Sequence, residues 1–375
     1  MPTLISGQGE LIKCADILKN TKNDHVFIVT DKTLVSLGIV KQLIDFLAKE
    51  QLNFTVFDEV TPDPTTSVIE LGVSQFQENQ CDSIITLGGG SVMDCGKAIA
   101  ACVVKNKRII ALSGLFRVRK NLPTFIAIPT TAGTGSEATL VAVVTDPIKK
   151  QKFTVIDPCL VPHYAIIDPL LMIGLPAKIT AETGIDALTH AVESYIGLHS
   201  TVQTRSYCFD AIKRIFNYLP QAYEEGENIT ARTEMSLASY YAGVAFTRTS
   251  IGYVHAIAHQ LGGYYHIPHG LANAVLLPHI LRFSFDKAYQ QYAEIARHAG
   301  IANSDDIDKI AAEKFIEAVK ALNSRLNIQV IFPELKREDI SLLANRAIKE
   351  AYCEYPVPKQ MTVNECEDIL RKLLA

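Results

Sequence analysis

The strongest constraint on the fold is an alternation of short apolar runs with helix-like segments, which fills the first half of the chain and then stops. Residues 25–30, 54–57, 83–87 and 124–128 are continuous apolar runs of the kind found in strands buried on both faces. Helical patterns such as residues 67–76 lie between them. This alternation predicts a parallel sheet flanked by helices. Further strands are predicted at residues 140–144, 153–156 and 165–167.

The second half of the chain has a different pattern. From about Lys178 strand signals disappear, and apolar residues recur with the helical period of 3.6. A chain of 375 residues is also too long for one compact core. We therefore predict an α/β domain over residues 1–177 and an all-helical domain over residues 178–375. Helices are predicted at residues 181–196, 202–218, 229–245 and 289–299.

Composition excludes several classes of function. A net charge of −4 offers no electrostatic attraction for nucleic acid. No apolar run approaches the length of a membrane span, and no basic segment leads into an apolar one at the start of the chain. The cysteines are scattered without a Cys-x-x-Cys pair, which predicts reduced thiols and a cytoplasmic protein. They are Cys14, Cys81, Cys95, Cys102, Cys159, Cys208, Cys353 and Cys366.

Two glycine-containing loops follow predicted parallel strands. Strand 83–87 runs directly into Gly88-Gly-Gly-Ser91, where backbone N–H groups and the positive end of a helix suit a phosphate. A tight turn needing a positive φ is the alternative, although three successive glycines exceed that requirement. The second loop, Pro129–Glu137, combines hydroxyls and glycines. Both loops leave the carboxyl ends of strands, where open α/β sheets bind ligands.

Asp31 follows the first of these strands. Its carboxylate is placed to accept hydrogen bonds from a ribose, and it is equally well placed to cap the next helix. The sequence leaves both interpretations open.

Histidines are concentrated near residue 260. His255, His259, His266 and His269 lie within fifteen residues of a chain that has ten histidines in all. His255 and His259 are four residues apart, so a helix would present both from one face. Asp186 and His190 repeat this spacing with a carboxylate. Three imidazoles and one carboxylate from these two segments predict a site for a divalent transition metal.

These motifs resemble those of the iron-containing (group III) alcohol dehydrogenase family, which has the dehydroquinate synthase-like fold. The matching segments span roughly the first three quarters of the chain in the family's order. They are Gly88-Gly-Gly-Ser-x-x-Asp94, Ile128–Glu137, Gly184–His190, Gly252–Gly270 and Ala272–His279.

The resemblance implies a Rossmann-like dinucleotide-binding domain, a helical metal-binding domain and an active site in the cleft between them. It implies hydride transfer between NAD and a small alcohol or aldehyde, with NADP a less favoured cofactor. The metal, Fe²⁺ or alternatively Zn²⁺, would polarise the substrate oxygen. Homodimers or larger homo-oligomers are expected.

The resemblance also assigns roles to individual residues. Asp186, His190, His255 and His269 correspond to the metal ligands. The corresponding position of His259 lies beside the metal, near substrate and nicotinamide, so His259 is the expected catalytic residue. Glu193, one turn after His190, becomes a surface or supporting residue and not a ligand. Cofactor contacts are expected from Asp31, Gly88, Gly89, Gly90, Ser91, Asp94, Thr130, Thr131, Thr134, Thr139 and Lys152.

The chain departs from the common family pattern close to the expected substrate. Many relatives read Ala-Phe-Asn-Asn-Ala where this chain has Ala245-Phe-Thr-Arg-Thr249, and His266 stands where asparagine is frequent. Phe246 and Arg248 are therefore candidate substrate contacts. Arg248 would lie on the face of His255 if one helix continued through both. A helix break in residues 247–252 would leave it exposed or paired elsewhere.

Three other activities are possible alternatives. Two use the same fold, namely a glycerol- or glycerol-phosphate-type dehydrogenase and a dehydroquinate synthase-type lyase. The third is a metallohydrolase, which would leave the two glycine-containing loops without a role. NADH binding separates the hydrolase from the dehydrogenase.

Overall fold

The computed structural model describes residues 1–149, 151–352 and 355–375, and these form two compact units, Met1–Ile173 and Gly174–Ala375. The boundary predicted from sequence lies slightly later, between residues 177 and 178. Cys353 lies outside the described residues. The other seven cysteines are free thiols. Within the described residues, no helix has both the length and the apolar character needed to cross a bilayer.

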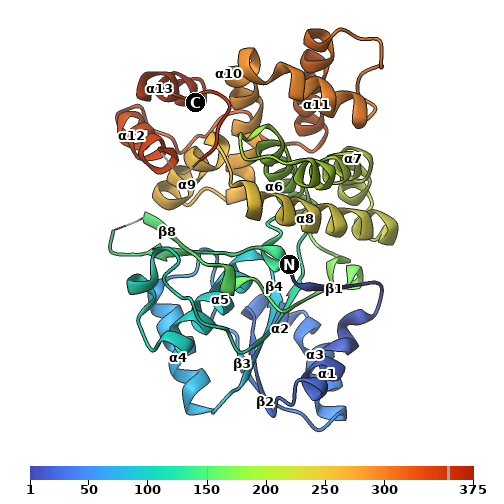
Figure 1. Cartoon of the computed structure of the whole chain (residues 1–375), viewed down its shortest axis with the longest axis vertical. Coiled ribbons are helices and arrows are strands. Elements are labelled where there is room, and N and C mark those ends of the chain that lie inside the picture. Colours follow the sequence, from blue (N-terminus) through green and yellow to red (C-terminus); the bar gives the residue numbers. More distant parts are fainter. Residues whose placement is uncertain (150, 353–354) are drawn as a thin grey trace. The chain divides into compact units, whose positions relative to one another are not determined.

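The first unit is built on a six-stranded sheet in the order β1-β9-β6-β4-β2-β3, in which every neighbouring pair is parallel. This confirms the predicted α/β fold. In Figure 1, helices α4 and α5 lie on one side of the strands and α1 and α3 on the other. The strands are β1 (Thr3–Ser6), β2 (His25–Val29), β3 (Asn53–Phe57), β4 (Ser83–Gly88), β6 (Thr124–Pro129) and β9 (Tyr164–Ile167), and the helices are α1 (Lys13–Asn20), α2 (Lys32–Ser36), α3 (Ile39–Lys49), α4 (Thr66–Glu78) and α5 (Gly90–Lys105).

The central strands are apolar throughout because both of their faces are covered. Along β2, Phe27 and Val29 pack into one buried cluster, whereas Val26 and Ile28 pack into another. Successive strand residues point to opposite faces of a sheet, so a strand buried on both sides needs apolar residues at every position. This is why the sequence signal was a continuous run.

A second, three-stranded sheet departs from the predicted pattern. It consists of β5 (Gly114–Leu115), β8 (Gln151–Ile156) and β7 (Val141–Asp146), and the β7–β8 pair is antiparallel. Both β7 and β8 were predicted as further strands of the first half without a separate sheet. Only four residues separate them, and so short a connection suits a hairpin and cannot make a parallel crossover.

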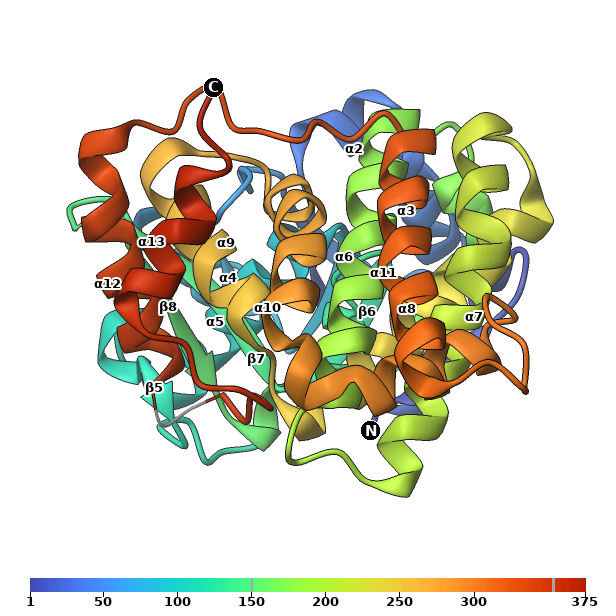
Figure 2. The same ribbon diagram turned by 90° about the horizontal axis from the view of Figure 1, so that it is seen from above.

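The second unit consists of helices, as predicted. Helix α10 packs against both α6 and α11, and the three helices can be followed in Figure 2. The predicted helix at residues 289–299 is the end of the much longer α10. The helices are α6 (Ala177–Ile196), α7 (Val202–Glu224), α8 (Ile229–Thr249), α9 (Tyr253–Tyr265), α10 (His269–His298), α11 (Asp308–Arg325), α12 (Ile340–Ala351) and α13 (Val363–Arg371).

Candidate functional site

Both glycine-containing loops leave the same edge of the six-stranded sheet. In the pairing of β4 with β6, Gly88 lies opposite Pro129, so the loops that follow begin side by side. Strand β2 is the other neighbour of β4, and Asp31 follows it at this edge. The topology therefore brings together three segments that are far apart in the sequence, at the edge where open parallel sheets bind ligands.

The glycines are needed where the loops approach each other. A Cβ atom on Gly90 would lie 2.5 Å from Cγ2 of Thr134, and one on Gly88 would lie 2.5 Å from Cγ2 of Val92. A side chain at either position would force its neighbour to move. Gly90 is also the first residue of α5, so its surroundings combine bare backbone with the positive end of a sixteen-residue helix. This arrangement suits a pyrophosphate.

A buried lysine holds the end of the second loop through hydrogen bonds. Lys97 on α5 has no exposed surface, and its Nζ donates to Oγ and O of Ser136 at 2.9 and 2.6 Å. It also donates to Oγ1 and O of Thr139 at 2.8 and 2.9 Å and to the carbonyl of Val141 at 3.1 Å. Burial lowers the pKa of Lys97 to about 8, against the opposing effect of Asp94 and Glu137. Sequence reasoning missed this residue, although a lysine in the apolar face of a predicted helix was a signal.

Carboxylates complete this buried network. Asp94 accepts from the Ser136 hydroxyl at 2.8 Å and from the Val143 N–H at 3.0 Å, so it is bound to the protein's own backbone and loop. Burial raises the pKa of Asp94 and raises that of Glu137 to about 7. Asp94 and Glu137 thus belong to the buried network around Lys97 that holds the second loop.

The remaining expected cofactor residues lie in three different surroundings. Thr131 lies beside Gly89 and Thr134 beside Gly90 at the meeting of the loops, and the N–H of Thr130 donates to the carbonyl of Gly88. Thr139, by contrast, is buried and bonded to Lys97. Away from the loop junction, Asp63 accepts from Lys152 Nζ at 2.6 Å, and its N–H donates to Ser91 Oγ at 3.3 Å.

Asp31 caps α2, as one of the two interpretations of the sequence proposed. Its Oδ1 accepts from the N–H of Leu34 at 3.0 Å. The carboxylate is half-buried at the same sheet edge as the two loops.

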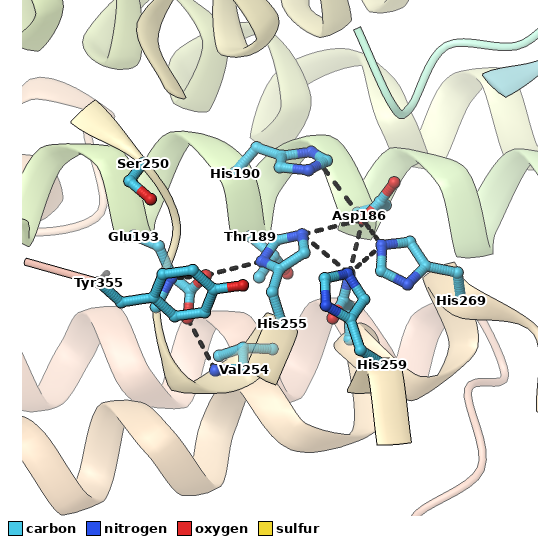
Figure 3. Close-up of polar contacts among 12 residues, drawn as sticks. Asp186, Thr189, His190, Glu193, Ser250, Val254, His255, His259, His269 and Tyr355 are labelled. Atoms are coloured by element: carbon cyan, nitrogen blue, oxygen red, sulfur yellow. Dashed lines mark hydrogen bonds and ion pairs between the residues drawn. The ribbon is translucent and has the colours of Figure 1, made fainter. Parts of the chain in front are cut away.

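The second unit brings the four expected metal ligands together from three helices. Asp186 and His190 lie one turn apart on α6, His255 is in the first turn of α9, and His269 opens α10. Figure 3 shows the three imidazoles directed toward the carboxylate of Asp186. Its Oδ1 lies 3.9 Å from His190 Nδ1, 3.7 Å from His255 Nε2 and 3.6 Å from His269 Nε2. Donor atoms of Asp186, His255 and His269 all lie within 4.8 Å of one another.

The carboxylates in and beside this cluster stabilise positive charge between them. Burial alone would raise the pKa of Asp186, but His190, His269 and His255 hold it well below its usual range. Burial opposes protonation of His255, yet Asp186 and Glu193 raise its pKa to about 9. Imidazole nitrogens and a carboxylate oxygen are also the donors that divalent iron or zinc accepts. The residues present therefore fit such an ion.

Asn273 is a member of the cluster that sequence reasoning missed. Its Nδ2 donates to Asp186 Oδ1 at 2.7 Å and lies 3.2 Å from Nε2 of His255 and of His269. The side chain is completely buried. Asn273 follows His269 by four residues on α10, so the helical spacing already placed both on one face.

His259 lies beside the cluster and has a different carboxylate partner. Its Nδ1 is 2.6 Å from Oε1 of Glu350 on α12, and its ring stacks on His269 with centroids 5.4 Å apart. Glu350 also accepts from Tyr355 at 2.7 Å and from Gln260 at 2.6 Å. Burial would raise the pKa of Glu350, but these partners lower it, so the group is a carboxylate. Nothing in the sequence motifs pointed to Glu350.

The two candidate substrate residues are separated by the structure. Phe246 stacks on His190 with ring centroids 4.2 Å apart, directly against the cluster. Arg248 is exposed in the last turn of α8 and donates to Gln203 at 3.1 Å. Helix α8 ends at Thr249 and α9 begins at Tyr253, so no single helix carries Arg248 and His255.

Comparison with known families agrees with the motifs. Residues 2–169 match the family described as iron-containing alcohol dehydrogenase, and residues 180–374 match the C-terminal part of the Fe-containing alcohol dehydrogenase family. The chain belongs to this family. The two matches end and begin on either side of the division between the compact units.

Characterised relatives cover almost the whole chain. A protein named NAD-dependent methanol dehydrogenase from Bacillus methanolicus is 37% identical, over 100% of this chain and 98% of the relative. Lactaldehyde reductase from Escherichia coli is 36% identical, over 97% and 95%. The crystal structure of a 1,3-propanediol oxidoreductase superposes with a TM-score of 0.96 at 36% identity, covering 99% of this chain and 98% of the other. Relatives in the family are thus NAD-dependent alcohol dehydrogenases and aldehyde reductases.

Proposed function

We propose that this protein interconverts a small alcohol and its aldehyde, transferring a hydride between the substrate carbon and the nicotinamide of NAD. The observation that carries the proposal is the convergence of Asp186, His190, His255 and His269 in a chain of this family. In the reducing direction, NADH supplies the hydride to the carbonyl carbon, and a proton goes to the carbonyl oxygen.

Asp186, His190, His255 and His269 would hold a divalent metal, with Fe²⁺ expected from the family and Zn²⁺ as the alternative. Such an ion supplies Lewis-acid polarisation of the substrate oxygen. The residues themselves provide one anionic and three neutral donors, so the occupied site would keep a net positive charge. Phe246 would form an apolar wall beside His190, which suits a short substrate.

His259 would move the proton. With Glu350 ionised, the hydrogen bond places the proton of a neutral His259 on Nδ1 and leaves a lone pair on Nε2. Nε2 is then able to take a proton from an alcohol or, when protonated, to return one to the product of aldehyde reduction. Glu350 would act here by orienting the ring.

NAD would bind at the sheet edge formed by Asp31, the Gly88–Ser91 turn and the Pro129–Glu137 loop. Pyrophosphate would lie against the bare backbone at the start of α5, and Asp31 would accept from the adenosine ribose. A carboxylate at the ribose repels a 2′-phosphate, so we propose NAD over NADP. Cytoplasmic location and a homo-oligomeric state stay predictions.

The test is an NADH-oxidation screen over short aldehydes and hydroxy-aldehydes, using apo-protein reconstituted with Fe²⁺ or with Zn²⁺. We expect metal-dependent oxidation of NADH with stoichiometric formation of the alcohol. Absence of oxidation with both metals, in protein that binds metal and NADH, would overturn the proposal. Hydrolysis of esters without NADH would indicate the metallohydrolase instead.

A further inference from the structure

The carboxylate of Glu193 is buried next to the four expected ligands and is bound by both the backbone and a side chain of α9. It lies on α6, and its side chain is only 4% exposed. Its oxygens accept from three donors of one short segment. Oε2 accepts from the Gly252 N–H at 2.8 Å and lies 2.7 Å from His255 Nδ1, and Oε1 accepts from the Val254 N–H at 2.8 Å.

These contacts decide which nitrogen of His255 faces the cluster. A carboxylate can only accept, so at Nδ1 it selects a ring that carries hydrogen there. The lone pair of the neutral ring is then on Nε2, the nitrogen that lies 3.7 Å from Asp186. A metal requires that lone pair. Figure 3 shows Glu193 on one side of the His255 ring and Asp186 on the other.

Glu193 also fixes the position of the backbone segment that carries His255. Gly252 and Val254 flank the start of α9, and their N–H groups belong to the first turn, which has no partner within its own helix. Binding of these N–H groups to the same carboxylate ties the backbone and the side chain of His255 to one point on α6. The fit is close, since a Cβ on Gly252 would lie 2.7 Å from Oε1 of Glu193.

We propose that Glu193 is a positioning residue that sets the affinity of the metal site by holding His255 with Nε2 directed at the ion. The inference rests on the metal site proposed above and adds a residue on which metal affinity depends without ligation. Carboxylates that orient a ligating histidine in this way change metal affinity by about 10- to 100-fold when they are removed.

The test compares Glu193→Gln with Glu182→Gln, the same change at a buried acid about three turns earlier on α6, where Glu182 forms an ion pair with Lys178 at 3.9 Å. Glutamine keeps the size of the side chain but presents an NH₂ group to one of the three donors. Zn²⁺ affinity of each apo-protein is measured by competition with a chelator, beside its urea unfolding midpoint without metal. In Zn²⁺-loaded protein with ¹⁵N-labelled histidine, the Nδ1 proton of His255 is followed by NMR.

We expect wild-type protein and Glu182→Gln to bind Zn²⁺ alike and Glu193→Gln to bind about 10- to 100-fold more weakly. The His255 Nδ1 proton should move upfield in Glu193→Gln only. Glu193→Asp, which keeps the acceptor charge on a shorter side chain, should recover part of the affinity. This variant also serves if Glu193→Gln does not fold.

Two results would contradict different statements. If wild-type protein binds no metal, the proposed metal site itself is wrong. If wild-type protein binds Zn²⁺ and Glu193→Gln binds it within twofold, with the Nδ1 proton unmoved, then Glu193 only caps α9 and the positioning role is wrong. A lower unfolding midpoint with unchanged Zn²⁺ affinity also leads to that second conclusion.

Discussion

The proposed metal cluster and the proposed cofactor edge are built in different ways. In the helical unit, three helices supply Asp186 and the imidazoles. Burial is the largest single influence on the pKa values of Asp186 and His255, but the charges and hydrogen bonds of their neighbours together outweigh it. In the α/β unit, the proposed pyrophosphate site is bare backbone at the start of α5, and Lys97 and Glu137 are buried in the support of the second loop. There burial dominates, so the pKa of Lys97 falls and that of Glu137 rises. The first arrangement presents donor atoms that could hold a cation, whereas the second holds a loop in shape.

The largest effect expected from this contrast is at the metal cluster. Substituting alanine for Asp186, His190, His255 or His269 should abolish metal retention and activity, because each removes a converging donor. His259→Ala should retain the metal and lose activity, since Glu350 holds this ring beside the cluster. Metal content by elemental analysis is the measurement. Complete metal loss in His259→Ala would show that the assignment of ligands is wrong.

The next effect tests the buried support of the cofactor loop. Lys97→Met removes every hydrogen bond from Nζ and leaves buried acceptors without a donor. Each acceptor that gains no other donor lowers the stability of the folded protein by about 1–3 kcal/mol. We expect NADH to bind at least about tenfold more weakly while metal content stays unchanged. Lys105→Met, the same change at the partly exposed end of α5, is the control. Equal NADH affinity in both variants would mean that the loop keeps its shape without Lys97.

A smaller effect is expected at Asp31, where cofactor choice and helix capping coincide. Asp31→Asn keeps a capping side chain for Leu34 but removes the charge, so it should relax the preference for NAD with little change in stability. Asp31→Gly should relax it as well. The ratio of kcat/KM with NADH and with NADPH is the measurement. If unmodified protein uses both cofactors equally, the role of Asp31 in selection is wrong.

The smallest effect is expected at Arg248. The end of α8 and the hydrogen bond to Gln203 leave this side chain exposed. Arg248→Ala should change KM by less than about twofold for alkyl aldehydes, in keeping with the small effect of most exposed substitutions. A selective rise in KM for anionic or polyhydroxylated aldehydes would show instead that Arg248 contacts the substrate.

Local sequence patterns predicted most of the individual strands and helices, because the burial of an element leaves its mark on that element's own residues. Strand β2 is continuously apolar because two helical layers cover it, and the spacing of Asp186 and His190 follows from the period of α6. The sequence could not predict that β7 and β8 form their own sheet. The short connection between the two strands favours an antiparallel pair, but an apolar run carries no sign of which other strands it will join.

The sequence by itself determined the fold class, the helical spacing of Asp186 with His190 and of His255 with His259, and the glycine turn after β4. Tertiary structure alone decided which side chains meet. Glu193 and Glu350 bind neighbouring histidines of α9, yet one precedes them by about sixty residues and the other follows by about ninety. Lys97 reaches backbone atoms some forty residues away. Such contacts arise from the packing of whole helices, and no periodicity within a single segment encodes them.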